Sequence, residues 1–141
     1  MIEPIYDETG FWFSEGCVAM KLNANWGFID SNNKTIVPFI YDKVKGFSEG
    51  LAAVELNDKW GWVDKTGKLV IPVKEYSHVG FFSNGGAAIN INGKWGFINT
   101  KGEEIIAPIY DDVYSYKNGK AKVVVNGKII FVDENGKQVS E

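Results

Sequence analysis

Hydrophobic and polar positions along this chain recur with a period of two residues rather than with the period of a helix. Ala52, Val54 and Leu56 alternate with the residues between them, and residues 18–22 and 121–125 repeat this phase. Such a period is typical of strands, whose side chains point alternately to opposite faces. No long stretch shows helical periodicity, so the pattern predicts an all-β fold.

The chain contains four copies of one sequence repeat. A short segment appears as NWGFID at Asn25–Asp30, KWGWVD at Lys59–Asp64, KWGFIN at Lys94–Asn99 and, in degenerate form, KIIFVD at Lys128–Asp133. The copies are separated by 34, 35 and 34 residues. A second motif, an aromatic residue three positions before a glycine, precedes them at residues 13–16, 47–50, 82–85 and 116–119. We expect one domain, residues 1–141, with repeats at approximately 5–39, 40–73, 74–109 and 110–141.

Turn-forming residues divide each repeat into about four short strands. Asn57-Asp58 and Asn92-Gly93 each stand between two strands, where Asn-Gly favours a tight hairpin with positive φ. Asp64–Gly67 predicts a type I turn closed by a left-handed glycine, and Asn33 takes the glycine place in the first repeat. The next strand is expected to end at Pro72, because proline lacks the N–H that central pairing needs.

The repeated Trp-Gly pairs are interpreted as parts of the scaffold. Exposed tryptophans could stack on sugars or bind cations, but Trp60 and Trp62 share a strand face beside an apolar strand, which favours a core. The glycine between them faces the other side and predicts either close approach of a neighbouring backbone or a strong twist. Because no helix follows these glycines, a phosphate-binding loop is not expected.

Neighbouring repeats are expected to stack, because one repeat cannot bury its own aromatic face. The prediction is an all-β fold in which four repeats of short antiparallel strands form an open, twisted hairpin array. A four-bladed β-propeller is the alternative, since four strands per repeat resemble a blade. Met1–Pro4 and Gly136–Val139 could then complete one strand and close the ring.

These residues carry a resemblance to a known family. Trp26-Gly27, Trp60-Gly61 and Trp95-Gly96, each followed by an aromatic residue and Ile or Val, resemble the bacterial WG repeat, also described as the KWG repeat. The resemblance covers essentially the whole chain and departs at Ile129-Ile130 in the fourth repeat. It implies an all-β repeat protein of interaction-type or unknown function, and it implies no catalytic or binding residues.

Composition excludes several classes of function. A net charge of −3 argues against a dedicated nucleic-acid binder, and no apolar run is long enough for membrane insertion. The single Cys17 excludes a disulfide framework, and the single His78 makes a histidine metal site or a Ser-His-Asp triad hard to build. We therefore expect no enzyme activity, no cofactor and no metal. The chain shows no signal peptide, which predicts a cytoplasmic protein.

Acidic residues recur at two positions of the repeat. One set is Asp7, Asp42 and Asp111, and the other is Asp30, Asp64 and Asp133. Stacked rows of carboxylates can bind calcium, but Ser77 and Asn99 interrupt the two sets. Both positions suit side chains that cap turns through backbone N–H groups, and this interpretation is preferred.

Departures from the repeat supply the candidate binding residues. The residue before the repeated aromatic is Trp12, Gly46, Phe81 or Ser115. If the repeated aromatics point inward, Trp12 and Phe81 point outward and form a contact surface. We predict a non-enzymatic binding module that presents this surface to a protein partner. Binding of a glycan or cell-envelope ligand through the exposed aromatics is the alternative.

The fourth repeat differs most from the others. It replaces Trp-Gly with Ile129-Ile130, and it alone carries Lys120 and Lys122 at outward positions of the preceding strand. Terminal repeats of stacked arrays are usually atypical, because they hide a face that interior repeats bury. This repeat is therefore predicted to act as a cap.

Overall fold

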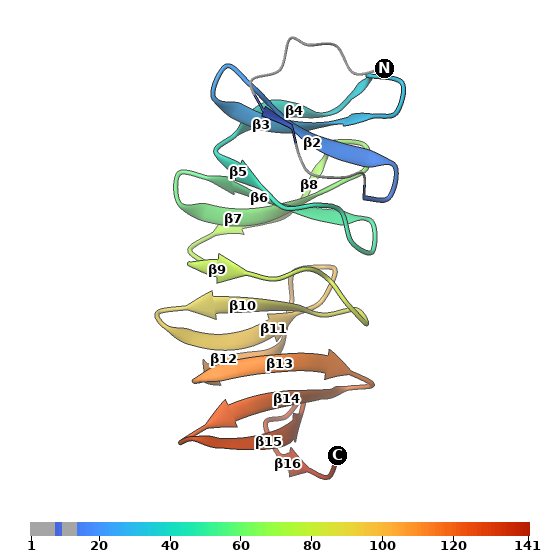
Figure 1. Cartoon of the computed structure of the whole chain (residues 1–141). Helices are drawn as coiled ribbons and strands as arrows, with labels where there is room; N and C mark the ends of the chain where they lie inside the picture. The colour runs from blue at the N-terminus through green and yellow to red at the C-terminus, as the bar shows by residue number, and fades with distance from the viewer. Residues whose placement is uncertain (1–7, 10–13) are drawn as a thin grey trace. The chain divides into compact units, whose positions relative to one another are not determined.

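The computed structural model describes residues 8–9 and 14–141 (Figure 1). All regular structure in these residues is β-strand, so this part of the chain contains no helix that could cross a membrane. The strands form four antiparallel sheets of four strands each, in which strands consecutive in sequence are neighbours. None of these sheets closes into a barrel. The predicted all-β repeat of short antiparallel strands is confirmed.

Each sheet corresponds to one sequence repeat. The first contains β1 (Glu8–Thr9), β2 (Cys17–Leu22), β3 (Asn25–Asp30) and β4 (Thr35–Tyr41). The second contains β5 (Lys43–Val44), β6 (Leu51–Leu56), β7 (Lys59–Asp64) and β8 (Leu69–Lys74). The third contains β9 (His78–Val79), β10 (Ala87–Ile91), β11 (Lys94–Ile98) and β12 (Glu104–Tyr110). The fourth contains β13 (Asp112–Lys117), β14 (Lys120–Val125), β15 (Lys128–Asp133) and β16 (Gln138–Val139).

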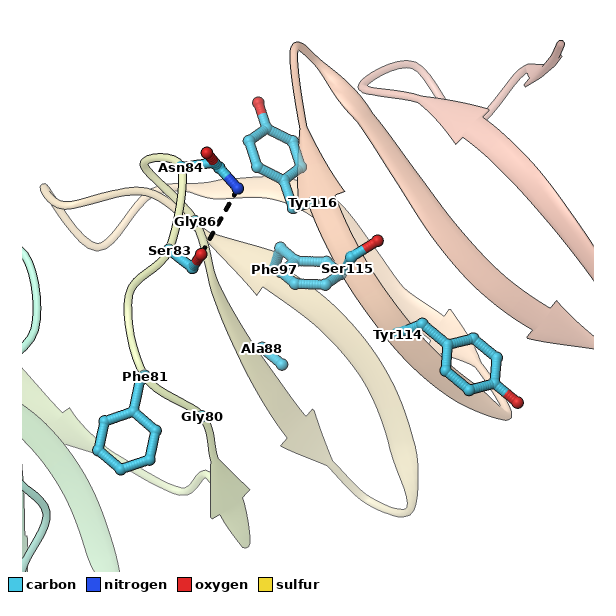
Figure 2. A pocket seen from close by; sticks show the side chains of 10 residues that line it. All are labelled: Gly80, Phe81, Ser83, Asn84, Gly86, Ala88, Phe97, Tyr114, Ser115 and Tyr116. Carbon is cyan, nitrogen blue, oxygen red and sulfur yellow. Dashed lines mark hydrogen bonds between the residues drawn. The ribbon is translucent and has the colours of Figure 1, made fainter. Parts of the chain in front are cut away.

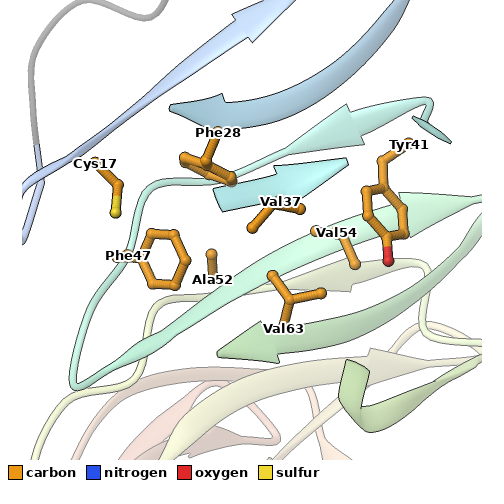
Figure 3. Close-up of a cluster of buried hydrophobic side chains, with 8 residues drawn as sticks. All are labelled: Cys17, Phe28, Val37, Tyr41, Phe47, Ala52, Val54 and Val63. Atoms are coloured by element: carbon orange, nitrogen blue, oxygen red, sulfur yellow. The ribbon is translucent and has the colours of Figure 1, made fainter. Parts of the chain in front are cut away.

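The sheets belong to two compact units, an N-terminal unit (Met1–Lys74) and a C-terminal unit (Glu75–Glu141). Two repeats complete one core within each unit. In the N-terminal unit the first sheet contributes Cys17, Phe28, Val37 and Tyr41, and the second sheet, with the loop between β5 and β6, contributes Phe47, Ala52, Val54 and Val63 (Figure 3). In the C-terminal unit the buried cluster is formed by Phe97, Ile106, Tyr110, Ala121, Val123 and Val132. Each repeat supplies one side of its core, as the stacking argument predicts.

The glycine of each Trp-Gly pair lies against the backbone of the next strand. A Cβ on Gly61 would lie 2.5 Å from the carbonyl oxygen of Ile71. A Cβ on Gly27 or Gly96 would lie 2.4 or 2.3 Å from the equivalent carbonyl oxygen. At each of these points the pairing between the two strands shifts register, which brings one backbone over the other. The predicted close backbone approach is confirmed.

The expectation that a strand ends at Pro72 is wrong. β8 continues through Pro72 to Lys74, and β4 and β12 pass Pro38 and Pro108 in the same way. All three prolines lie on the outermost strand of their sheet, within the register shift. An edge strand at a bulge has N–H groups that need no ladder partner, so proline is tolerated there.

The ring alternative depends on the two ends of the chain. Met1–Pro4 lies outside the described residues. At the other end, Gln138–Val139 forms β16, which pairs with β15 through Val132–Gln138 and Phe131–Val139.

The hairpin turns have the predicted left-handed conformation. Asn92 and Gly93 have φ angles of 53° and 85°, and Asn57 has a φ of 54°. The same turn in the first repeat places Ala24 at a φ of 73°. Alanine is strained in this region because its Cβ approaches the neighbouring carbonyl, whereas glycine is not.

Ala24→Gly is therefore expected to raise the free energy of unfolding by about 1 kcal/mol, because relief of backbone strain exceeds the added chain entropy. Gly93→Ala is the matched reverse change. No atom lies within 4 Å of a Cβ built there, so only the φ of 85° opposes the substitution. It should lower the free energy of unfolding by a similar amount. Chemical denaturation measures both, and a destabilised Ala24→Gly variant would contradict this account.

Candidate functional site

Two of the four described tryptophans belong to the core. Trp60 and Trp62 are buried, with 6% and 1% of their surface exposed. Trp26 and Trp95 are half-buried. The core interpretation therefore holds most strongly for the second repeat.

One row of acidic residues caps turns, as predicted. Asp64 Oδ1 accepts hydrogen bonds from the N–H groups of Thr66 and Lys68, at 2.8 and 3.2 Å. The same pair of bonds is made in the other repeats by Asp30, Asn99 and Asp133. Because the amide of Asn99 serves as well as a carboxylate, the position needs an oxygen acceptor and not a negative charge.

The other row, which contains Asp42 and Asp111, also caps turns. The capped turn is not the adjacent one but a hairpin turn further along the chain, which the sequence did not reveal. Asp42 Oδ2 accepts from the N–H of Asn57 at 2.9 Å, in a hairpin turn 15 residues away. Asp111 makes the equivalent bond in the fourth repeat, while Asp7 lies outside the described residues. Within residues 8–9 and 14–141, no group of three His, Cys, Asp or Glu residues could hold a metal ion.

The capping bonds of Asp64 predict a pH dependence. The pKa of Asp64 lies below its usual value, chiefly because the hydroxyl of Thr66 donates to the carboxylate. Burial opposes this shift, and the N–H groups of Thr66 and Lys68 add to it. A carboxyl group whose pKa is lower in the folded state than in the unfolded state stabilises the fold when it is ionised. This stability is fully present above the pKa of the unfolded state and is lost as the pH falls through the pKa of the folded state.

Asp64→Asn is expected to keep the stability of the native protein at neutral pH, because Asn99 makes the same bonds. The variant should lose less stability than the native protein between about pH 5 and pH 2. Asp64→Ala, the control, should lose about 1 kcal/mol at neutral pH because the turn amides are left uncapped. Urea denaturation across this range measures both. Equal acid sensitivity of Asp64→Asn and the native protein would refute the assignment.

Cys17 and His78, the single cysteine and the single histidine of the sequence, lie in different units. Cys17 is 5% exposed in the core of the N-terminal unit, and burial raises the pKa of its thiol. His78 is exposed on the edge strand β9, and its ring lies 6.2 Å from that of Trp95.

The C-terminal unit contains a surface pocket of about 300 Å³. One wall is the segment from Gly80 to Ala88, and the other is Tyr114–Tyr116 of β13 (Figure 2). Phe97, on β11, lies between the two walls. The pocket is therefore located where the third repeat meets the first strand of the fourth.

Phe81 lines this pocket, and its orientation agrees with the sequence pattern. It is 56% exposed, whereas the next residue, Phe82, is 1% exposed. Its side chain lies at the opposite end of the pocket from that of Tyr114 (Figure 2). The role of Phe81 in binding stays a prediction. Trp12, the other predicted binding residue, lies outside the described residues.

Sequence reasoning missed Tyr114, which is 58% exposed. The register between β13 and β14 shifts between Val113 and Ser115, so Tyr114 is the extra residue of a bulge. Tyr114 directly precedes Ser115, the residue of the fourth repeat that is equivalent to Phe81. At the position of Tyr114, the second and third repeats have Lys45 and Gly80. The sequence has an aromatic residue at this position in the first and fourth repeats, Phe11 and Tyr114, and this recurrence was the available signal.

In the N-terminal unit, hydrogen bonds between described residues join the equivalent motifs of the first two repeats. Ser14 Oγ donates to the carbonyl oxygen of Phe47. The N–H of Gly50 donates to Glu15 Oε1 at 2.9 Å, and Lys65 Nζ lies 3.2 Å from the same oxygen. These contacts join the motif of the first repeat to that of the second.

In the C-terminal unit, Ser83 and Asn84 stand in the places of Ser14 and Glu15. Asn84 Nδ2 donates to Ser83 Oγ at 3.5 Å (Figure 2). No hydrogen bond between described residues joins either side chain to β13. The pocket therefore lies where, among the described residues, this connection between consecutive repeats is not made.

Tyr116 is held firmly at the wall of the pocket. Its ring lies 5.7 Å from that of Phe97, and a Cβ on Gly86 would come within 2.8 Å of it. Its hydroxyl donates to the Glu134 carboxylate. Burial and this carboxylate raise the pKa of Tyr116 to about 12, so the hydroxyl remains a donor at neutral pH.

The backbone of Tyr116 faces outward from the sheet. Lys117 pairs with Lys120 across the two-residue turn of Asn118 and Gly119, whose φ angles are 53° and 76°. In such a hairpin the residues that flank the turn exchange their backbone bonds, and the adjacent residue directs its N–H and C=O away from the partner strand. The Tyr116 carbonyl thus corresponds to the Phe47 carbonyl, which accepts from Ser14 in the N-terminal unit.

The fold and this site define an all-β repeat protein whose repeated positions serve the scaffold. A family model, the WG containing repeat, matches residues 1–26, 26–60, 60–95 and 95–128, and the chain belongs to this family. No curated protein matches the chain.

Among solved structures, one described as "KlHsv2 with loop 6CD replaced by a Gly-Ser linker" is similar, with a TM-score of 0.55 and 10% identity. The similarity covers 93% of this chain and 51% of that one, so this chain spans about half the length of that protein. At this identity the likeness shows the fold alone.

Proposed function

We propose that this protein is a non-enzymatic interaction module that binds an extended peptide segment of a protein partner along the edge of β13. The observation that carries the proposal is the outward-facing backbone of Tyr116 beside an open pocket. The equivalent carbonyl of Phe47 is occupied by a hydroxyl within the chain. An exposed strand edge is a template for pairing with another extended chain, and adjacent pockets can then select its side chains.

The chemistry of the pocket supports binding rather than catalysis. Among the described residues that line it, tyrosine is the only titratable type, and the Tyr116 hydroxyl already donates to Glu134. General acid–base catalysis uses groups that exchange protons near neutral pH, such as imidazole or a perturbed carboxyl group. A lining of small, amide and aromatic side chains suits recognition instead.

Glycan binding is the second candidate, favoured by the exposure of Phe81 and Tyr114. Both side chains are more than half exposed, at 56% and 58%. They lie at opposite ends of the pocket, however, and do not form one platform for a sugar ring (Figure 2). Peptide pairing uses the backbone groups that the site offers, so it is the preferred function.

The proposed function is tested by filling the pocket. Ala88 lines it, and Ala88→Phe places a ring in the space that a peptide would use. Calorimetry with a blocked hexapeptide of alternating valine and glutamate should show about tenfold weaker binding to this variant than to the native protein. Ala107→Phe makes the same change at an exposed position of β12 and should bind like the native protein.

Equal affinity of Ala88→Phe and Ala107→Phe for the hexapeptide would overturn the assignment of the pocket. Saturable binding of a sugar from a glycan panel, with no binding of the peptide, would favour the second candidate. Thermal melting of both variants checks that each is folded before the affinities are compared.

A further inference from the structure

We infer that the peptide segment bound along β13 is acidic, an inference that rests on the proposed function. The observations that carry it are the position and surroundings of three lysines in the β13–β14 hairpin. These lysines are Lys117, Lys120 and Lys122. Residues that pair directly across two strands point to the same face, and alternate residues share a face. The pairs Lys117–Lys120 and Ser115–Lys122 therefore place all three lysines on one face of the hairpin.

Lysine at these positions is particular to the fourth repeat. The equivalent residues of the third repeat are Ser83, Gly86 and Ala88. All three line the pocket, whose other wall is β13. In the fourth repeat, three side chains that can carry positive charge replace these small ones. The whole chain has a net charge of −3, so the hairpin is locally basic on an acidic protein.

Two of the three lysines are associated with β13, the edge strand. Lys117 is exposed on β13 itself. Lys122 belongs to β14, and its Nζ lies 5.4 Å from the centre of the ring of Tyr114, the bulge residue of β13. Lys120 is directed elsewhere, because its Nζ donates to the carbonyl oxygen of Ser140 at 3.2 Å. Lys117 on β13 and Lys122 on β14 thus lie on the face of the hairpin opposite the core residues Ala121 and Val123, with the ammonium group of Lys122 near the bulge of β13.

Lys117 and Lys122 differ from Lys94, which pairs with Asp111. Among the described residues, neither lysine forms an ion pair with a carboxylate. Of the nearby acidic groups, Glu134 accepts from the Tyr116 hydroxyl, and Asp112 Oδ1 accepts from the N–H of Val113 at 2.8 Å. The edge therefore offers positive charge that an incoming strand could match.

Strand pairing would bring acidic side chains to these ammonium groups. An added strand beside β13 places alternate side chains next to Ser115 and Lys117, on the face that carries the lysines. Opposite charges paired across strands favour association modestly, and exposed pairs are weakened by salt. Charge would then select among peptides that all share the same backbone pairing.

Three blocked hexapeptides separate charge from backbone pairing. Each alternates valine with one other residue, which is glutamate, glutamine or lysine. Calorimetry at low salt should show the glutamate peptide binding about tenfold more tightly than the glutamine peptide, with the lysine peptide weakest. In about 1 M salt the glutamate and glutamine peptides should become nearly equal, because screening is then nearly complete.

Lysine variants locate the source of the preference. Lys117→Ala and Lys122→Ala should each reduce the advantage of the glutamate peptide by about threefold and leave binding of the glutamine peptide unchanged. Lys120→Ala removes the same charge from the same face, but its ammonium group faces Ser140, so the preference should persist.

Each outcome bears on a different claim. Equal binding of the glutamate and glutamine peptides to the native protein would overturn the acidic partner while leaving strand pairing in place. Binding of none of the three peptides would overturn both. A preference that disappears in Lys120→Ala, but persists in Lys117→Ala and Lys122→Ala, would contradict the assigned geometry.

Discussion

Phe28→Ala is expected to lower the free energy of unfolding by about 4 kcal/mol, more than any other substitution considered for this protein. Phe28 is 1% exposed, and its ring lies 4.8 Å from that of Phe47, so it joins the first two repeats. Removing the ring leaves a cavity between two sheets whose backbones are fixed by strand pairing. Chemical denaturation measures the loss.

The matched comparison is Trp26→Ala, in the same strand. Trp26 belongs to the Trp-Gly signature, but it is only half-buried. Its loss should cost about 2 kcal/mol, because less apolar surface returns to water and water can enter the space. If Trp26→Ala were the more destabilising change, the signature tryptophan rather than the aromatic two residues later would be the main core residue of the repeat.

Gly61→Ala is expected to lower the free energy of unfolding by about 3 kcal/mol, the upper end of the usual range for an overpacked site. The new Cβ would lie 2.5 Å from the carbonyl oxygen of Ile71 and 2.9 Å from the nitrogen of Val73. Both atoms belong to the backbone of β8, which cannot move without breaking its pairing with β7. Chemical denaturation of this variant measures the effect of one methyl group.

Gly50→Ala is the control for this change. Gly50 has a φ of 80°, and no atom lies within 4 Å of a Cβ built there. Only backbone strain opposes the substitution, so the loss should be about 1 kcal/mol. Equal losses for Gly61→Ala and Gly50→Ala would show that the close approach of β8 does not explain the glycine.

Local chemistry made much of the fold predictable. The period of two gave the strands, and the Asn-Gly and Asp-x-x-Gly segments gave two of the turns in each repeat. A further two-residue turn was present in the repeated motif but was not identified. Glu15 and Glu49 occupy it with φ angles of 52°, which are unusual for glutamate. Asn84-Gly85 and Asn118-Gly119, at the same place in later repeats, carried the signal for it.

Tertiary relations were not predictable from one repeat at a time. The passage of β8 through Pro72 depends on the strand being outermost and on a register shift, and both are properties of the assembled sheet. The fourth repeat illustrates the same limit. In the described residues, pairing between β15 and β16 stops at Phe131, so no paired backbone crosses Ile130 and glycine is not required there.

The pocket is also a product of pairing between repeats. In the N-terminal unit, the Ser14 hydroxyl donates to the Phe47 carbonyl. In the C-terminal unit, the equivalent Ser83 side chain bonds to Asn84 instead of to Tyr116. The sequence shows serine at both places and cannot distinguish the two side-chain orientations. It does show Asn84 where the first two repeats have glutamate, which is the difference that marks the open site.

The central claim is that β13 accepts an extended peptide as an additional strand. Nuclear magnetic resonance of the isotope-labelled protein, titrated with the alternating valine–glutamate hexapeptide, tests it most directly. The account predicts that the Tyr116 amide becomes protected from solvent exchange and that backbone protons of the peptide come close to those of Tyr116. Binding of the peptide with an unchanged exchange rate at Tyr116, and with contacts confined to other strands, would contradict the account.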